Sequence, residues 1–327
     1  MSLGVGVIGA GVMGAEHARI LREEVRGAHL AAVADADRGR AVAAAGGARV
    51  HDHAAALIAD PGVQAVMIVA PDALHAELVR ACLAVGKPVL CEKPLAATAA
   101  ESLALVEAEV ALGRRLVQVG YMRRFDPGYR AMKAALKAGE IGAAKLLHNT
   151  HRNAAAPAWF VGAMPITNSF VHEVDISRWL LDAEMVEATL HSGPEGDPLL
   201  VTMTAADGTL VSTEVFMNCA YGYHVEAELV GQTGTLTLAQ PAPLVVNRQG
   251  GRAQSYPDNW VPRFAAAYAA QTNAWVQSLR HGQPCGASAW DGYVATALAE
   301  QLAASLGQSG PVTFAFPAKP ALYEAAT

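Results

Sequence analysis

Short apolar runs alternate with helix-like patterns over the first third of the chain. The strand-like runs lie at residues 3–8, 29–35, 65–70, 88–91 and 116–121. Between them, apolar residues recur at helical spacing over residues 12–22, 38–45, 74–85 and 99–112. Strands that are apolar almost throughout are buried on both faces, and intervening helices are typical of parallel pairing. We therefore predict an α/β domain with a parallel sheet over residues 1–121.

The pattern changes after residue 121. A helix, a strand and a helix are predicted at residues 126–137, 145–152 and 169–181. Strand-like runs then follow in succession at residues 185–191, 199–205, 210–217, 225–230, 235–239 and 244–247. Short turns between these runs predict an antiparallel sheet, and two helices, at residues 263–280 and 289–306, end the pattern. We predict an α+β domain over residues 122–327.

Composition narrows the class of protein. The 327 residues are 52% hydrophobic and 17% charged, so both domains can bury a core and global disorder is excluded. The net charge of −6 argues against binding to nucleic acids or anionic membranes. No run approaches the roughly 18 apolar residues of a membrane helix, and the first residues do not resemble a secretory signal. The four cysteines stand far apart, so we expect buried thiols in a cytoplasmic protein rather than disulfides or structural zinc.

Residues 9–14 form a G-x-G-x-x-G pattern between the first strand-like run and the first helical one. In this context the first glycine permits a tight turn, the second lets the backbone approach a pyrophosphate, and the third lets helix and strand pack closely. Asp35 ends the second strand about 20 residues further on, where an acid binds the ribose of NAD and disfavours NADP. Arg38 and Arg40 stand close by and could weaken that preference. A glycine turn without a ligand is the alternative.

The segment Cys91-Glu92-Lys93-Pro94 ends a predicted parallel strand on the carboxyl side of the sheet. Ligands bind at that edge in open α/β folds. Lys93, beside a strand-end proline, is poorly placed to be a mere solvated charge. Taken alone, it is as compatible with a structural role as with a functional one.

The glycine turn, Asp35, Glu92-Lys93-Pro94 and 171–175 (V-H-E-V-D) occur in the order found in the Gfo/Idh/MocA oxidoreductase family, which the chain resembles over nearly its whole length. Segments 120–126, 151–153 and 218–223 resemble the inositol 2-dehydrogenase branch of that family. The resemblance implies an N-terminal Rossmann fold that binds NAD and a C-terminal domain with an open antiparallel sheet and helices, which binds substrate and mediates oligomerisation. It also implies an active site between the domains and a cis peptide bond before Pro94.

The resemblance also implies roles for single residues. Lys93 would hydrogen-bond the reacting hydroxyl, and His172 would remove its proton. The residues implied in substrate binding are Arg123, His151, Asn168 and Tyr223, with Tyr221 as a weaker alternative to Tyr223. The residues implied in cofactor binding are Gly9, Gly11, Val12, Met13, Gly14, Asp35, Ala70, His75, Glu92 and Lys93. Without the resemblance, the histidines and the tyrosine are as readily explained by packing.

One position departs from the family pattern, which has an aspartate four residues before the histidine. Asn168 stands there, four residues before His172. Residues at this spacing share one face of a helix, so the amide can still meet the imidazole. It carries no charge to stabilise an imidazolium, so substrate or efficiency can differ from those of the inositol enzymes.

We expect NAD-dependent oxidation of a secondary hydroxyl of a cyclic polyol similar to myo-inositol, giving the ketone by hydride transfer. One alternative is dehydrogenation of another sugar: an anhydrosugar, an aminocyclitol or an aldose. A second is a non-catalytic protein that binds NAD or sugar. The expected partner is a small polyol or sugar, with no nucleic acid, membrane or metal. The local cluster His51-Asp52-His53 lies away from the strand ends that carry Lys93.

The resemblance further implies a homodimer or homotetramer that associates through the open sheet. The sequence supports this only weakly. Val211, Thr213, Val215 and Met217 make one mostly apolar face of a predicted strand, while Ser212 and Glu214 interrupt the other.

Overall fold

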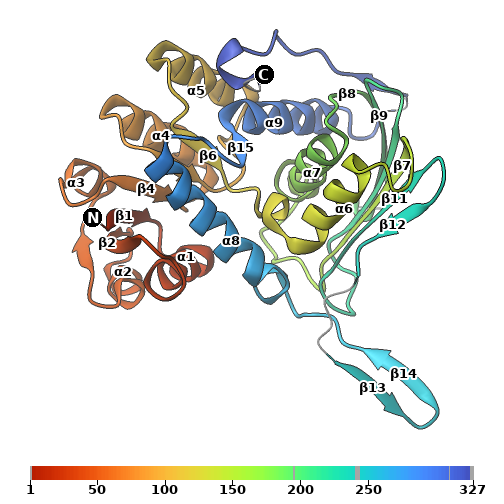
Figure 1. Ribbon diagram of the computed structural model, residues 1–327, viewed down its shortest axis with the longest axis horizontal. Coiled ribbons are helices and arrows are strands. Elements are labelled where there is room, and N and C mark those ends of the chain that lie inside the picture. The colour runs from red at the N-terminus through yellow and green to blue at the C-terminus, as the bar shows by residue number, and fades with distance from the viewer. Residues whose placement is uncertain (1, 194–195, 240–243, 309, 325–327) are drawn as a thin grey trace. The chain divides into compact units, whose positions relative to one another are not determined.

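The computed structural model describes residues 2–193, 196–239, 244–308 and 310–324 (Figure 1). The chain divides into two compact units. Unit 1 comprises the described residues of Met1–Phe125, Ala266–Ala297 and Phe316–Thr327, and unit 2 those of Asp126–Ala265 and Leu298–Ala315. The division predicted at residue 121 assigned every later residue to the second domain, whereas the structure returns two later segments to unit 1.

The described residues of unit 1 form a seven-stranded sheet in the order β15-β6-β5-β4-β1-β2-β3. Its strands are β1 (Leu3–Ile8), β2 (Ala28–Ala34), β3 (Arg49–His51), β4 (Ala65–Ile68), β5 (Val89–Cys91), β6 (Val117–Val119) and β15 (Ala287–Ser288). Strands β1 to β6 pair in parallel, and β15 is antiparallel to β6. This order confirms the predicted Rossmann fold.

The helices that precede residue 126 follow the strands of this sheet, and two of them have side-chain caps at their N-termini. They are α1 (Val12–Glu23), α2 (Arg38–Ala45), α3 (Ala54–Ala59), α4 (His75–Ala84) and α5 (Ala99–Leu112), with short 3-10 turns η1 (Asp72–Leu74), η2 (Met122–Phe125) and η5 (Ala321–Tyr323). Asp37 caps α2 by accepting from the amide of Arg40, and Thr98 caps α5 by accepting from the amide of Glu101. Gly113 ends α5 in the left-handed conformation. The short β3 and α3 were not predicted, because neither is long enough to show a period.

The core of unit 1 draws on distant parts of the chain. Helix α8 (Trp260–His281) places Trp275 and Val276 in one cluster with Leu21 of α1 and with Val5 and Met67 of the sheet. This burial explains why the segment Ala266–Ala297 belongs to unit 1. Two cysteines of this unit, Cys82 and Cys91, are buried as expected, and burial raises the pKa of the Cys82 thiol to about 12. Cys219 and Cys285 are only partly buried.

The described residues of unit 2 form a second seven-stranded sheet in the order β12-β11-β7-β10-β9-β8-β16. Its strands are β7 (Ala144–Arg152), β8 (Met185–Ser192), β9 (Leu199–Ala205), β10 (Leu210–Phe216), β11 (His224–Gly231), β12 (Thr235–Thr237) and β16 (Val312–Thr313). The pairing is antiparallel as predicted, except that β7 and β10 are parallel. The exception arises because β7, which comes before the succession of strands, enters the middle of the sheet.

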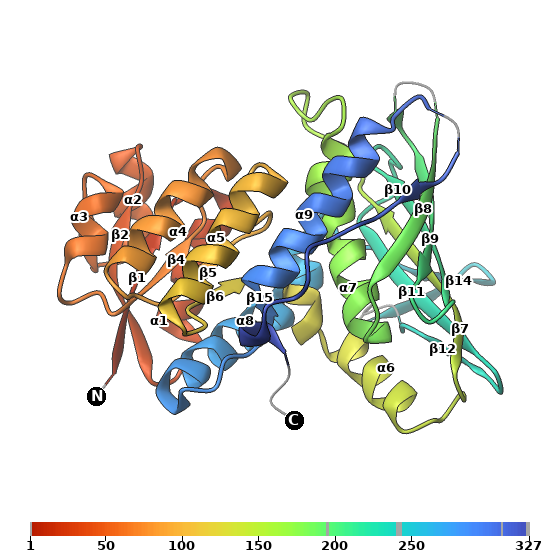
Figure 2. The ribbon, with the colours of Figure 1, turned by 90° about the horizontal axis from the view of Figure 1, so that it is seen from above.

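Helices α6 (Pro127–Lys137) and α7 (Val171–Leu181) cover one face of this sheet (Figure 2). The mostly apolar face of β10 is buried within the unit, with Val211, Val215 and Met217 each at most 5% exposed. These side chains are therefore used within the unit, and the expected subunit contact through the open sheet stays a prediction. The opposite face presents Leu200 and Leu210, which are 45% and 52% exposed.

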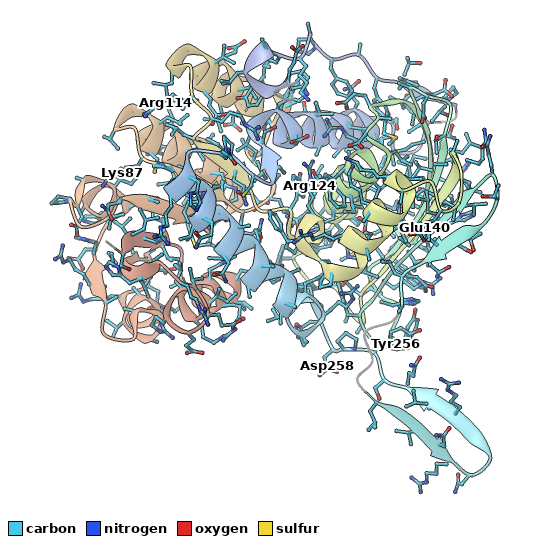
Figure 3. All side chains as sticks on the ribbon, in the orientation of Figure 1. Lys87, Arg114, Arg124, Glu140, Tyr256 and Asp258 are labelled. Carbon is cyan, nitrogen blue, oxygen red and sulfur yellow. The ribbon has the colours of Figure 1, made fainter. Side chains whose placement is uncertain are left out.

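A separate hairpin follows the sheet. Strands β13 (Val245–Arg248) and β14 (Gly251–Gln254) pair with each other in a sheet of their own (Figure 1). The run predicted at residues 244–247 thus forms a strand, but not one of the main sheet. Tyr256, labelled at the base of the hairpin in Figure 3, packs against the rings of Tyr221 and His224 at 5.0 and 4.7 Å. Helix α9 (Ala289–Ala304) follows later in the chain, and within the described residues no helix is long and apolar enough to cross a membrane.

Candidate active site

The glycine turn between β1 and α1 is shaped by close backbone contacts. Gly9 has a φ of +95°, and a Cβ there would lie 2.3 Å from the carbonyl oxygen of Val69. A Cβ on Gly14 would lie 1.9 Å from the carbonyl oxygen of Gly9. At Gly11, by contrast, a Cβ would meet no described atom within 4 Å. The fold itself therefore requires the first and third glycines, whereas the second borders open space.

That open space lies at the N-terminus of α1. Gly11 is the N-cap residue, no side chain caps the helix there, and its first turn, which contains Val12 and Met13, holds no acidic residue. Free amide groups and the helix dipole favour an anion at such a position. The turn thus fits the pyrophosphate of a dinucleotide, as the sequence predicted.

Asp35 lies directly beside this turn. Its Oδ2 accepts a hydrogen bond from the amide of Ala10 at 2.6 Å, and its Oδ1 accepts from the amide of Asp37 at 2.7 Å and from the Arg40 guanidinium at 3.0 Å. Although burial alone would raise it, these hydrogen bonds hold the pKa of Asp35 below its ordinary value. The residue is therefore a fixed carboxylate next to the phosphate turn. Arg38 instead pairs with Asp52.

The turn Glu92-Lys93-Pro94 directly follows β5, at the carboxyl edge of the parallel sheet. The peptide bond between Lys93 and Pro94 is cis, which confirms the expectation from the resemblance. Glu92 is buried, and its Oε2 lies 3.3 Å from the backbone nitrogen of Lys93. Lys93 is partly exposed, so its ammonium group is held at a strand end without being sealed in the core.

His75 has a bracing position at the same edge. Its ring is fully buried, with Nδ1 2.7 Å from the carbonyl oxygen of Pro94 and Nε2 2.8 Å from that of Ala70. The histidine thereby joins the ends of β4 and β5. Both ring nitrogens face main-chain oxygens, so its contribution to the predicted cofactor site is to shape the strand ends.

In unit 2, His172 is the second residue of α7 and is only 9% exposed. The sequence predicted an α-helix from residue 169, but a π-helical turn, η3 (Pro165–Phe170), precedes α7. Asn168 lies in this wider turn. Such turns are rare and are frequent at functional sites. Asn168 and His172 therefore lie on either side of the junction between the π-helical turn and α7.

Three of the predicted site residues gather in unit 2. The ring of His151, on β7, lies 6.4 Å from the ring of His172 and 5.8 Å from that of Tyr223. His151 Nδ1 is 3.0 Å from a carboxylate oxygen of Glu173, which is fully buried. Sequence reasoning missed Glu173 as a partner, although it lies next to His172. A buried carboxylate on one ring nitrogen fixes the orientation and tautomer of the imidazole.

The two candidate tyrosines lie in different surroundings. Tyr223 is buried beside His151, whereas Tyr221 is 45% exposed. The Tyr221 hydroxyl is 2.5 Å from His224 Nδ1 and accepts a hydrogen bond from Arg152 at 3.0 Å. This geometry favours Tyr223 as the tyrosine of the histidine cluster.

Arg123 belongs to unit 1, on η2 directly after β6, and is 1% exposed. The neighbouring Arg124, labelled in Figure 3, pairs with Asp291 of the same unit at 3.2 Å. The structure thus places the predicted Arg123 at the carboxyl end of a sheet strand. It does not place it within the unit that holds the histidine cluster.

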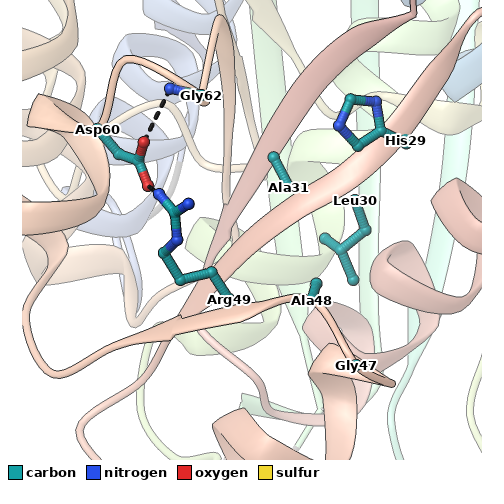
Figure 4. Close-up of a pocket in the computed structure, with 8 residues that line it drawn as sticks. All are labelled: His29, Leu30, Ala31, Gly47, Ala48, Arg49, Asp60 and Gly62. Atoms are coloured by element: carbon teal, nitrogen blue, oxygen red, sulfur yellow. Dashed lines mark hydrogen bonds and ion pairs between the residues drawn. The ribbon is translucent and has the colours of Figure 1, made fainter.

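The remaining candidate cluster has other partners. His51 Nε2 is 2.9 Å from Asp60, and Asp52 pairs with Arg38. Asp60 also binds the amide of Gly62 and the guanidinium of Arg49, in a surface pocket at the amino ends of β2 and β3 (Figure 4). The pocket therefore lies at the opposite edge of the sheet from the glycine turn. Within the described residues, no three histidine, cysteine, aspartate or glutamate side chains gather as a metal site would need.

Unit 1 is a Rossmann fold with an open phosphate turn and a lysine at a strand end. Unit 2 gathers two histidines and a tyrosine. These features are typical of a dinucleotide-dependent oxidoreductase. Family models agree: residues 3–121 match the oxidoreductase family with an NAD-binding Rossmann fold, and residues 129–237 match the GFO/IDH/MocA C-terminal domain. The chain belongs to the Gfo/Idh/MocA family of oxidoreductases.

Several relatives are similar over their whole length. The chain is 50% identical to inositol 2-dehydrogenase 1 of Saccharopolyspora erythraea, with 99% of each chain covered. It is 39% identical to inositol 2-dehydrogenase of Klebsiella pneumoniae, with 99% of this chain and 100% of the relative covered. Among solved structures, myo-inositol dehydrogenase from Lactobacillus casei, in complex with NAD(H) and myo-inositol, has a TM-score of 0.94 at 31% identity. That comparison covers 99% of this chain and 100% of the other.

Proposed function

We propose that the chain oxidises a secondary hydroxyl of a cyclic polyol, similar to myo-inositol, to the ketone with NAD. The observation that carries the proposal is the cluster of His151, His172 and Tyr223, in a chain that is 50% identical in sequence to an inositol 2-dehydrogenase. The open turn at Gly11 and the fixed carboxylate of Asp35 support NAD as the cofactor.

The proposed chemistry divides between two residues. His172 takes the proton of the hydroxyl as general base. Lys93 donates a hydrogen bond to the same oxygen and stabilises the negative charge that develops on it. Bound NAD supplies the acceptor for the hydride that leaves the carbon. Each proton and electron pair of the oxidation therefore has a destination.

The substrate residues fit a ligand that carries many hydroxyl groups and no charge. A cyclic polyol needs donors and acceptors in fixed directions, which the imidazole of His151, the amide of Asn168 and the phenol of Tyr223 provide. Glu173 holds His151 in one orientation, and this lowers the entropic cost of positioning the ring of the substrate. We propose that Arg123, which belongs to the Rossmann unit, also positions the substrate.

The proposed cofactor site uses the carboxyl edge of the Rossmann sheet. The glycine turn and the start of α1 would hold the diphosphate, and Asp35 the adenosine ribose. Ala70, His75 and Glu92 would shape the strand ends that border the nicotinamide half of the cofactor.

A different sugar is the second candidate, and Asn168 favours it. The amide replaces the carboxylate of the family pattern, so the pocket has one negative charge less to orient the base. An anhydrosugar, an aminocyclitol or an aldose would use the same chemistry. A non-catalytic binding protein would have no need for both the lysine and the histidine to which we assign charge stabilisation and proton transfer.

Two coarser features belong to the same proposal. We assign the enzyme to the cytoplasm, which is supported by the free thiols of Cys82, Cys91, Cys219 and Cys285. We also propose a homodimer or homotetramer. Its support is the exposure of Leu200 and Leu210 on the sheet face that α6 and α7 do not cover.

The test is NADH formation, followed by absorbance, with a panel of inositols, aldoses, anhydrosugars and aminocyclitols. We expect turnover with at least one inositol and a loss of about 10²–10⁴-fold in kcat for Lys93→Met, with NAD binding retained. Turnover restricted to a sugar outside the inositols would select the second candidate. Binding of NAD and polyol without any NADH would contradict both.

A further inference from the structure

His17, on α1, is a fully buried polar residue to which the proposed mechanism gives no task. We propose that His17 is a positioning residue for Lys93, acting through the carboxylate of Glu92. The inference rests on the proposed function of Lys93 as the residue that stabilises charge on the substrate oxygen.

The contacts form a short relay. His17 Nε2 lies 2.8 Å from Glu92 Oε1, and the other oxygen of Glu92 lies 3.3 Å from the backbone nitrogen of Lys93. The ring of His17 thus holds one oxygen of the Glu92 carboxylate, while the other oxygen accepts from the backbone amide of Lys93. We call the segment Glu92-Lys93-Pro94 the catalytic turn. With its proton on Nε2, His17 donates to the Glu92 carboxylate, and a hydrogen bond to a carboxylate is charge-assisted and stronger than a neutral one.

The polar contacts of His17 point to this one target. Its Nδ1 has no hydrogen-bond partner among the described residues, and its ring meets Tyr268 edge-on at 5.6 Å. A histidine needed only for volume would be replaceable by an apolar residue, because a buried nitrogen without a partner carries a cost. The hydrogen bond to Glu92 therefore accounts for the presence of an imidazole here.

The surroundings of Glu92 leave its carboxylate little freedom. A Cβ on Gly120 would lie 2.8 Å from the carboxylate, so strand β6 closes a further side. Without the donor at His17, a buried carboxylate would need another partner, and the nearest flexible cation in sequence is the ammonium group of Lys93. The hydrogen bond with His17 supplies that partner and so fixes the carboxylate that contacts the backbone nitrogen of Lys93.

The relay also joins two parts of the cofactor site. His17 lies on the same helix as Gly14, one turn beyond the phosphate turn. Its bond to Glu92 therefore links the helix that receives the diphosphate to the turn that carries Lys93. His75 holds Pro94 on the other side, so the catalytic turn is braced by a buried histidine at each end.

The experiment compares His17→Leu, which removes the donor, with His17→Gln, whose amide nitrogen can reach the position of Nε2. Ile20→Val is the matched control, because Ile20 is fully buried on the same helix. We expect His17→Leu to lower kcat by about 10- to 100-fold, with the dissociation constant of NAD changed less than about threefold. His17→Gln should recover most of the loss, and Ile20→Val should keep the wild-type kcat.

A second measurement needs no turnover. Hydrogen exchange of the Lys93 amide, followed by NMR on the protein without ligands, should be about tenfold faster in His17→Leu and near wild type in His17→Gln. If His17→Leu does not fold, His17→Asn serves in its place, since its shorter side chain cannot reach Glu92.

The outcomes separate the inference from the proposed function. Unchanged kcat and unchanged amide exchange in His17→Leu or His17→Asn would overturn the role of His17, even where Lys93→Met is inactive. A third result is a wild-type protein that oxidises no polyol, with amide exchange that is faster in His17→Leu and near wild type in His17→Gln. That result would support the relay and contradict the proposed function.

Discussion

Asp35 is a fixed carboxylate beside the glycine turn, and we propose that it also governs the choice of cofactor. It accepts from the amide of Ala10 within the glycine turn, and its other oxygen meets Arg40. The acid would repel the 2′-phosphate of NADP, while the arginine is placed to receive that phosphate once the acid is gone. The two side chains therefore oppose each other in cofactor selection.

Asp35→Ser should shift the preference toward NADP. We expect the ratio of kcat/KM for NADP to that for NAD to rise by about tenfold or more, because like charges in close contact cost several kcal/mol. Steady-state kinetics with both cofactors checks this. In the background of Asp35→Ser, Arg40→Ala should remove the gain; an unchanged ratio in the single variant would show that Asp35 does not face the 2′ position.

At this scale the sequence predicts residues more readily than their partners. The glycine pattern and Asp35 stand at fixed spacings, so their positions follow from the sequence. The pairs His17–Glu92 and His151–Glu173 join residues from different elements, and tertiary packing alone brings them together. Only the proximity of Glu173 to His172 in the sequence could have drawn attention to it.

Among the elements, the π-helical turn before α7 bears most directly on the chemistry. It carries Asn168 one turn before His172, in a wider spiral than the predicted α-helix. A carboxylate at this position would stabilise the protonated ring of the base, whereas the amide does not.

Asn168→Asp should therefore move the acidic limb of the pH–rate profile for polyol oxidation to higher pH, since the base loses its proton later. His172→Ala should lower kcat by about 10²–10⁴-fold and leave the protein folded. Initial rates measured across pH check both changes. An unchanged acidic limb together with an active His172→Ala would exclude His172 as the base.

The C-terminal turn η5 is attached to α5 by a second buried carboxylate. Glu109, fully buried on α5, accepts from the Tyr323 hydroxyl at 2.5 Å and from the amide of Val117 at 2.6 Å. Burial raises the pKa of Glu109 above its ordinary value of 4.5, although these hydrogen bonds oppose the rise. The folded state therefore binds a proton more readily here than the unfolded chain does.

Glu109→Gln tests this linkage. Because the folded pKa is raised, the contribution of Glu109 to stability is complete below pH 4.5 and falls as pH rises through the folded pKa. The destabilisation caused by Glu109→Gln should thus be largest in acid and shrink as the pH rises toward neutral. Urea unfolding of both proteins at several pH values measures the difference. A gap that widens with pH would contradict the raised pKa.

Helices and strands were predicted where the hydrophobic pattern extends over enough residues, and were missed where the element is very short. The helix at residues 38–45 and the strand at 199–205 have the predicted bounds. Strand β3 and helix α3 have too few residues to show a period. The run at 244–247 is a true strand, but its pattern does not reveal that its partner is the next strand rather than the main sheet.

For the whole molecule, the change of pattern after residue 121 indicates two kinds of sheet, and the structure has both. The sequence does not indicate that the chain returns to unit 1. An amphipathic helix shows the same period whichever core it enters, so only the burial of Trp275 and Val276 with Val5 assigns α8 to the Rossmann unit. The parallel pairing of β7 and β10 was not predicted either, because the alternation of residues along a strand does not show which strand lies beside it.

The proposed reaction moves a hydride from a ring carbon of a cyclic polyol to NAD. The most direct test incubates the purified protein with NAD and with myo-inositol that carries deuterium on its ring carbons, and analyses the reduced cofactor by mass spectrometry. We predict reduced cofactor that carries deuterium from the ring carbon, and no carbon-bound deuterium in the cofactor when unlabelled myo-inositol is oxidised in D₂O. Reduced cofactor that carries no deuterium after oxidation of the labelled ring would contradict this transfer.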